Sequence, residues 1–120
     1  MADQLLSVII PAMNAGRTLP ALLDSLLRLE PPPGWNVEII ASYTESNDDT
    51  LSVLEKSGIV IVICKAIGPG AARNAGAAAA AGSLFYFIDA DAEPVGDDFL
   101  FRLFRNAEKF EQDGGFGGFG

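Results

Sequence analysis

Two carboxylates stand at the end of an apolar run in the last third of the chain. The segment LFYFIDADAEP, residues 84–94, places Asp89 and Asp91 directly after five apolar or aromatic residues. In a straight strand these two side chains would point to opposite faces, but they can converge where the backbone turns beyond a strand. Mg²⁺ and Mn²⁺ prefer oxygen ligands and need only one or two carboxylates when a phosphate supplies the rest. The pair is therefore a candidate metal site; the alternative is a pair of solvated loop acids, and Glu93 is unassigned.

A glycine-rich segment, GPGAARNAG at residues 68–76, carries the second candidate chemistry. Gly68 and Gly70 let a ligand approach the backbone closely, and a helix that begins here would favour anions at its N-terminus. The segment partly matches the dinucleotide fingerprint G-x-G-x-x-G. However, Arg73 occupies the third glycine position, where close packing of helix on strand leaves no room for a side chain, so we exclude a nicotinamide or flavin site. Arg73 and Asn74 either face solvent, or Arg73 reaches a nucleotide or its phosphates with its rigid donor fork.

The composition narrows the classes of partner and of chemistry. The 16 acidic residues against 8 basic ones give a net charge of −8, so no basic stripe is present to neutralise nucleic-acid phosphates. The chain contains no histidine, which removes the usual general base and the commonest metal ligand, so a metal here would be held by oxygen. The single cysteine, Cys64, ends the apolar run IVIVIC, which predicts a buried and inert thiol.

The N-terminal segment has no basic region ahead of its short apolar run, which is not the pattern of a signal peptide. No stretch reaches the ~20 apolar residues that a transmembrane helix requires. These patterns indicate a cytoplasmic protein without a transmembrane segment, and they leave open a membrane association of a longer enzyme.

Apolar periodicity alternates between short β-branched runs and helical stripes along the chain. Leucines at three- and four-residue spacing predict a first helix that is capped by Thr18, carries Pro20 in its first turn and ends at EPPPG, residues 30–34. We expect Ser46 or Asn47 to cap a second helix with acids in its first turn. The predicted strands span 5–12, 36–42, 59–65 and 84–89, the second helix ends at Gly58, and later helices run from the GPG segment to near Gly82 and over 97–111.

Four strands alternating with four helices predict an α/β fold, a Rossmann-like and mostly parallel sheet with helices on both faces. The chain has the size of one domain, which we assign to residues 1–112, and the Gly-rich residues 113–120 are a tail or a truncated segment. In open sheets of this kind ligands bind beyond the carboxyl ends of the strands. The predicted strand ends carry residues 11–14, 42–45, 65–70 and 89–93.

Four segments taken together resemble the nucleotide-sugar-binding half of a family 2 glycosyltransferase with the GT-A fold. They are SVIIPAMNAGRTL, EIIASYTESNDDT, GPGAARNAGAAAAAG and LFYFIDADAEP, in the order and spacing of that family. The resemblance implies that Asp89 lies near the ribose of a nucleoside diphosphate sugar and that Asp91 binds Mn²⁺ or Mg²⁺ on its diphosphate. It implies that Arg73 lies near the base and phosphates. It also implies that the loop with Pro11, Ala12 and Asn14 lines the base pocket.

The chain departs from the family pattern after its second strand. There, Tyr43 or Thr44 stands in place of the acid that hydrogen-bonds the base, and Met13 replaces the common aromatic residue of the first loop. Members of the family continue for about as long again, and that half supplies the acceptor pocket and the catalytic base. The resemblance therefore implies an incomplete GT-A domain. It would bind the donor sugar, leave the acceptor unidentified and transfer little sugar by itself.

Two other functions compete with a transferase donor domain. The first is a degenerate, non-catalytic nucleotide-binding domain that pairs with another chain, or with a second copy as a homo-oligomer, through exposed sheet edges. The second is a phosphatase of the haloacid-dehalogenase type, whose D-x-D also ends an apolar strand. Against the phosphatase, Ala92 stands where threonine or valine is usual, and the motif follows the fourth strand rather than the first.

Overall fold

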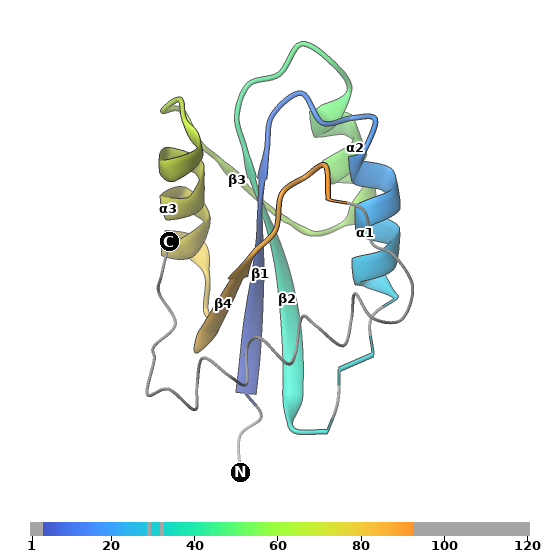
Figure 1. Cartoon of the computed structure of the whole chain (residues 1–120), viewed down its shortest axis with the longest axis vertical. Helices are drawn as coiled ribbons and strands as arrows, with labels where there is room; N and C mark the ends of the chain where they lie inside the picture. Colours follow the sequence, from blue (N-terminus) through green and yellow to red (C-terminus); the bar gives the residue numbers. More distant parts are fainter. Residues whose placement is uncertain (1–3, 29, 32, 93–120) are drawn as a thin grey trace.

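The computed structural model describes residues 4–28, 30–31 and 33–92, in which strands and helices alternate without exception (Figure 1). This order is the one expected for a parallel sheet whose strands are joined by helical crossovers. The elements are β1 (Gln4–Ala12), α1 (Leu19–Leu27), β2 (Trp35–Tyr43), α2 (Thr50–Ser57), β3 (Val60–Ile63), α3 (Pro69–Ala79) and β4 (Leu84–Phe87).

The strands form one parallel sheet in the order β3-β2-β1-β4, which confirms the predicted α/β class and strand direction. The first strand is central, with Ile9 opposite Ile40 on one side and Phe87 on the other. β1 ends at Ala12, as predicted, and begins one residue earlier than predicted, whereas β3 is shorter than the predicted 59–65. All four carboxyl ends therefore lie at the same edge of the sheet.

The helices cover both faces of the sheet, as predicted. Figure 1 shows α1 and α2 on one side and α3 on the other. Because strand side chains alternate, β1, which is buried over residues 6–10, places Leu6, Val8 and Ile10 in the core with α1, while Ile9 faces α3. The alanine-rich α3 lies close to the sheet at Gly76, where an added Cβ would overlap Ile9 Cγ2. The close helix-strand contact thus falls at Gly76 and not at residue 73.

The ends of the helices match the prediction only in part. Thr18 is the N-cap of α1 and Pro20 lies in the first turn, but the Thr18 side chain makes no capping hydrogen bond. The predicted cap of α2 at Ser46 or Asn47 is wrong, because the N-cap is Asp49 and the first turn holds no acid. The Ser46 side chain and the Asn47 backbone N–H instead hydrogen-bond the loop after β1, described below. Gly58 ends α2 in the left-handed region with φ 78°, as predicted.

Some predictions fall outside the described residues. These are the helix over 97–111, the Gly-rich tail and Glu93, so the division into 1–112 and 113–120 stays a prediction. Cys64 is buried, as predicted, with its thiol donating to the carbonyl of Ala66 at 3.3 Å. Within the described part of the chain, no helix combines the length and the apolar character that a membrane crossing requires.

Candidate functional site

A cavity of about 830 Å³ opens where the strands end, at the edge of the sheet that parallel α/β folds use for ligands. The loops that follow all four strands contribute to its lining. Of the residues that the sequence predicted for the site, the cavity is lined by Pro11, Ala12, Asn14, Thr44, Asp89 and Asp91. Tyr43 and Arg73 are not among the lining residues.

The two acids of the D-x-D segment lie on a tight turn after β4. The Ile88 N–H donates to the Ile9 carbonyl at 3.0 Å, and the Ala92 N–H donates to the Asp89 carbonyl at 3.0 Å. Ala90 between the acids is 7% exposed and packs into the core, whereas Asp89 and Asp91 are exposed. The buried alanine thus turns both neighbouring carboxylates outward, and both line the cavity.

This pair of acids suits a hard divalent cation. Among the described residues, neither carboxylate has a hydrogen-bond or ion-pair partner, so their oxygens are available as ligands. The same part of the chain contains no group of three or more His, Cys, Asp or Glu side chains able to hold a metal. A closed site built from protein ligands alone is therefore not formed here. The donor set fits Mg²⁺ or Mn²⁺, which accept one or two carboxylates and take their other ligands from phosphate and water.

The loop after β1 is held in place by the loop after β2. Three successive backbone N–H groups donate to side chains across the gap: Asn14 to Ser46 Oγ (2.8 Å), Ala15 to Thr50 Oγ1 (2.8 Å) and Gly16 to Asp48 Oδ2 (3.0 Å). In return the Asn47 N–H donates to Asn14 Oδ1 at 2.8 Å, and Asn14 takes a positive φ of 48°. Because these donors are used within the chain, the loop presents a fixed wall and not a free anion-binding nest.

Asp48 is the third acid that lines the cavity, but its oxygens are already in use. Its Oδ1 accepts the hydroxyl and the backbone N–H of Thr50, and its Oδ2 accepts the Gly16 N–H. The hydroxyl of Thr50, followed by the Gly16 and Thr50 N–H groups, lowers the pKa of Asp48 below its ordinary value. Asp48 therefore stabilises the loop structure, in contrast to Asp89 and Asp91, which have no such partners among the residues described.

The structure separates the two residues proposed to contact a base after β2. Thr44 lines the cavity, whereas Tyr43 packs in the core and its hydroxyl accepts the Ser46 N–H at 3.1 Å. Residue parity explains the difference, since neighbouring residues at a strand end point to opposite sides. The sequence alone had left open whether Tyr43 or Thr44 contacts the base.

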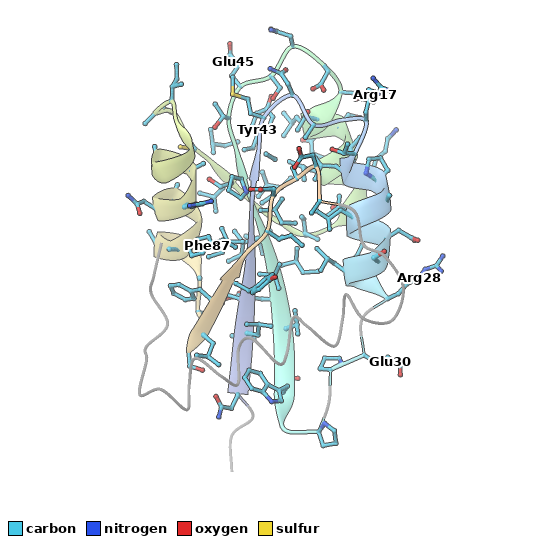
Figure 2. All side chains as sticks on the ribbon, viewed as in Figure 1. Arg17, Arg28, Glu30, Tyr43, Glu45 and Phe87 are labelled. Carbon is cyan, nitrogen blue, oxygen red and sulfur yellow. The ribbon has the colours of Figure 1, made fainter. Side chains whose placement is uncertain are left out.

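Arg73 turns away from the cavity toward the sheet. Its guanidinium carbon lies 5.8 Å from the centroid of the Phe87 ring, and its buried Nε has no hydrogen-bond partner within the described residues. Figure 2 shows the Phe87 ring beside α3. Arg17 is instead the one lysine or arginine of the described ranges that lines the cavity. Figure 2 shows Arg17 at the end of the molecule where the strands end. The turn pattern NAGRT in the sequence did not indicate a role for this arginine.

Two exposed apolar side chains also line the cavity, and the sequence analysis assigned neither a role in binding. Met13 follows β1 and is 51% exposed, and Ile67 precedes α3 and is 84% exposed. A large apolar side chain in a loop beside glycines is the signal that could have singled out Ile67. Together they give a polar site two apolar surfaces.

Comparison with known proteins places this geometry in context. The family model described as glycosyl transferase family 2 matches residues 7–119. Uncharacterized glycosyltransferases of Mycobacterium tuberculosis and Mycobacterium bovis are each 32% identical to the chain over 91 residues. These alignments cover 76% of this chain and 38% of each relative, so the chain spans well under half the length of the relatives that it matches.

Solved structures share the fold. TarS of S. aureus, residues 1–349 in complex with UDP, aligns with a TM-score of 0.65 and 25% identity over 94% of this chain and 32% of its own. Glucosyl-3-phosphoglycerate synthase from Mycobacterium tuberculosis, in complex with Mn²⁺, UDP and glucosyl-3-phosphoglycerate, aligns with a TM-score of 0.65 and 28% identity. That alignment covers 76% of this chain and 36% of the synthase. The likeness confirms the predicted GT-A architecture.

Proposed function

The chain belongs to glycosyl transferase family 2, and from that premise we propose that its cavity binds a nucleoside diphosphate sugar as the donor of a sugar transfer. One observation carries the proposal: Asp89 and Asp91 lie exposed in a cavity at the carboxyl edge of a parallel sheet and have no hydrogen-bond or ion-pair partner within the described residues. Unpaired neighbouring acids repel each other, and a bound cation would offset that repulsion. Support also comes from the similar structures that contain UDP, one of them with Mn²⁺.

Asp89 and Asp91 have different roles in binding the donor. Asp91 is the main carboxylate ligand for Mn²⁺ or Mg²⁺, and Asp89 contacts the ribose or completes the ligand set. When bound, the cation supplies Lewis-acid neutralisation of the charge on the leaving nucleoside diphosphate, a chemistry that needs no histidine. Asp48 takes no part as a ligand, because its oxygens accept hydrogen bonds from Thr50 and Gly16.

The base of the nucleotide occupies the part of the cavity between the first loop and the start of α3. Met13 and Ile67 offer exposed apolar surfaces there, and the fixed loop around Asn14 supplies a preorganised wall. The Thr44 hydroxyl can donate and accept, so it can pair with a base edge without adding charge. Pro11 and Ala12 complete the wall with short side chains. This arrangement favours a flat ligand held by contact area and a few neutral hydrogen bonds.

The phosphates need a cationic side chain besides the metal, and Arg17 is better placed for this than Arg73. Arg17 lines the cavity, is exposed and sits on the loop before α1, so its side chain is free to turn toward a diphosphate. Arg73 would first have to leave the Phe87 ring. Its buried Nε nevertheless has no hydrogen-bond partner in the described part of the chain, so a contact to ligand or to another part of the protein would satisfy it.

Donor binding is testable by calorimetric titration with UDP and with GDP, each with and without Mn²⁺. We expect Mn²⁺-dependent binding of at least one nucleotide, and we expect Asp91→Asn to abolish the dependence on Mn²⁺. Glu55→Gln is the matched control, because it removes one carboxylate from an exposed site on α2 that does not line the cavity. If neither nucleotide binds, or if Asp91→Asn behaves like Glu55→Gln, the donor-site proposal is wrong.

Transfer itself is a separate matter. An inverting transfer needs a carboxylate base on the acceptor side. Among the described residues, Asp48 is the only acid besides Asp89 and Asp91 that lines the cavity, and its oxygens accept loop hydrogen bonds. We therefore expect the 120-residue chain to bind donor without transferring sugar, and the acceptor remains unassigned. Robust transfer from a radiolabelled donor would contradict this expectation. Hydrolysis of p-nitrophenyl phosphate with Mg²⁺ would favour the phosphatase in its place.

A pairing role is the second candidate, and one observation favours it. The edge strand β3 exposes Val60 and Ile63, which are 52% and 57% accessible. Exposed apolar edges are pairing sites for another chain. Gel filtration at high protein concentration tests the pairing role, because a monomer would argue against pairing through this edge.

A further inference from the structure

The N-terminus of α1 is hydrogen-bonded to the D-x-D turn. The Thr18 hydroxyl donates to the carbonyl of Ala90, with the two oxygens 2.9 Å apart. Its other acceptor, the Ala15 carbonyl, lies 3.4 Å away. A hydroxyl has one proton, so the shorter contact is the hydrogen bond that counts. Thr18 thus gives its hydroxyl to a residue 72 positions along the chain instead of capping its own helix.

Ala90 is the residue whose position decides where both acids point. It is buried, and it stands between Asp89 and Asp91. Two backbone hydrogen bonds hold the ends of this turn, from Ile88 to Ile9 and from Ala92 to Asp89. Among the described residues, the bond from Thr18 is the contact that holds the middle of the turn by its peptide carbonyl.

Thr18 is itself attached to the most heavily hydrogen-bonded part of the site. The Thr18 and Leu19 N–H groups both donate to the Ala15 carbonyl, at 3.2 and 3.0 Å, and the Ala15 N–H donates to Thr50 Oγ1. The loops after β1 and β2 therefore form one hydrogen-bonded unit. Through Thr18 that unit extends to the turn after β4, so a shift in one loop is transmitted to the acids.

We propose that Thr18 is a positioning residue for the divalent cation: by holding the Ala90 carbonyl, it keeps Asp89 and Asp91 turned into the cavity. This inference rests on the proposed function, because it presumes that the two acids hold a cation. Groups that orient metal ligands without touching the metal affect metal affinity strongly, by about 10- to 100-fold when they are altered. Thr18 also lines the cavity, but its one hydroxyl proton is donated to the Ala90 carbonyl and is not offered to the donor.

The test compares two substitutions at one exposed position. Thr18→Val keeps the branched shape and removes the hydroxyl, whereas Thr18→Ser keeps the hydroxyl and removes a methyl group. Mn²⁺ affinity is measured by electron paramagnetic resonance of free Mn²⁺, and UDP affinity by calorimetry with Mn²⁺. Uridine, which lacks phosphates, is titrated without metal as a probe of the base pocket, and circular dichroism melting reports on folding.

We expect Thr18→Val to weaken Mn²⁺ binding about tenfold or more, and to weaken UDP binding with Mn²⁺ in parallel. Thr18→Ser should stay within about threefold of the unaltered chain, and neither change should alter uridine binding. If the unaltered chain binds Mn²⁺ and UDP and Thr18→Val matches it, the inference is overturned and the proposed function stands. Equal weakening by valine and serine, or an equal loss of uridine binding, would also overturn it. Absence of Mn²⁺-dependent binding of both UDP and GDP in the unaltered chain would overturn the proposed function and this inference together.

Discussion

The close packing of α3 on the central strand gives a prediction whose size follows from the structure. Gly76 is buried in the interior of α3, against Ile9 of β1. A Cβ added at residue 76 would lie closer than 3.0 Å to Ile9 Cγ2, a separation that real side chains do not show. Ile9 is fully buried and β-branched, so its side chain has little freedom to move aside. We therefore expect Gly76→Ala to destabilise the protein.

Two effects of opposite sign determine how much Gly76→Ala changes the free energy of unfolding. Alanine is favoured over glycine in a helix interior by about 1 kcal/mol. Overpacking a well-packed core costs about 1–3 kcal/mol, and this contact belongs at the upper end because Cγ2 sits on the stiff Cβ of Ile9. The overlap prevails, with a net loss of about 1–2 kcal/mol in the free energy of unfolding. A loss of that size lowers Tm by at least about 4 °C in a domain of about 100 residues.

The matched control is Gly70→Ala in the same helix. Nothing lies within 4 Å of a Cβ at residue 70, and its φ is not positive, so we expect a gain of about 0.5–1 kcal/mol. Both variants are measured by urea and thermal denaturation followed by circular dichroism. If Gly76→Ala is as stable as the unaltered chain, the helix does not lie against Ile9 as described. Because Gly68 and Ala72 line the cavity, the same displacement of α3 should also weaken UDP binding.

Two further predictions concern the charged residues of the cavity. Arg17→Met should weaken UDP binding about tenfold and leave uridine binding unchanged, since a charge-assisted contact to phosphate is lost. Calorimetry measures both affinities. The control is Arg28→Met, which removes an equal charge from the ion pair with Asp24 at the far end of α1 and should not change UDP binding. The folded-state pKa of Asp48 is lowered, so the stability it contributes is present above its unfolded pKa near 3.8 and is lost as the pH falls through the folded value. The Asp48→Asn variant should therefore be less stable than the unaltered chain at pH 7 and should lose less stability on acidification. Urea denaturation at pH 7, 5 and 3 measures both effects. If the variant loses as much stability on acidification as the unaltered chain, the acid sensitivity belongs to other groups.

Much of the architecture was predictable because it depends on local patterns. The continuous apolar run of β1 indicates a strand that is buried on both faces, and residues 6–10 are fully buried. Gly58 was identifiable as a helix terminator because only glycine adopts a left-handed φ without cost. The cap of α2 was not predictable in this way. Ser46 and Asn47 have the right chemistry for a cap, but the Ser46 hydroxyl accepts the Asn14 N–H and donates to the Thr44 carbonyl, and the Asn47 backbone N–H donates to the Asn14 side chain.

The candidate site was predictable as a set of loops and less so as a set of side chains. Strand order in a parallel sheet brings the ends of β1, β2 and β4 together whatever their details, which is why Asn14, Thr44 and Asp89 all line one cavity. The direction of a long side chain depends on what packs beside it. Arg73 lies beside the Phe87 ring and does not line the cavity, whereas Arg17, for which the sequence predicted no role, does line it.

By itself, the sequence determined the alternation of strands and helices and placed two carboxylates after an apolar strand, because periodicity and turn chemistry act over a few residues. Only the tertiary structure decided that the carboxylates are turned outward by a buried alanine whose carbonyl is held by Thr18. That hydrogen bond joins residues 72 positions apart, and no local pattern carries information across such a distance. The physical reason is that a hydroxyl bonds to whichever acceptor the folded chain brings within reach, and the fold alone determines which acceptor that is.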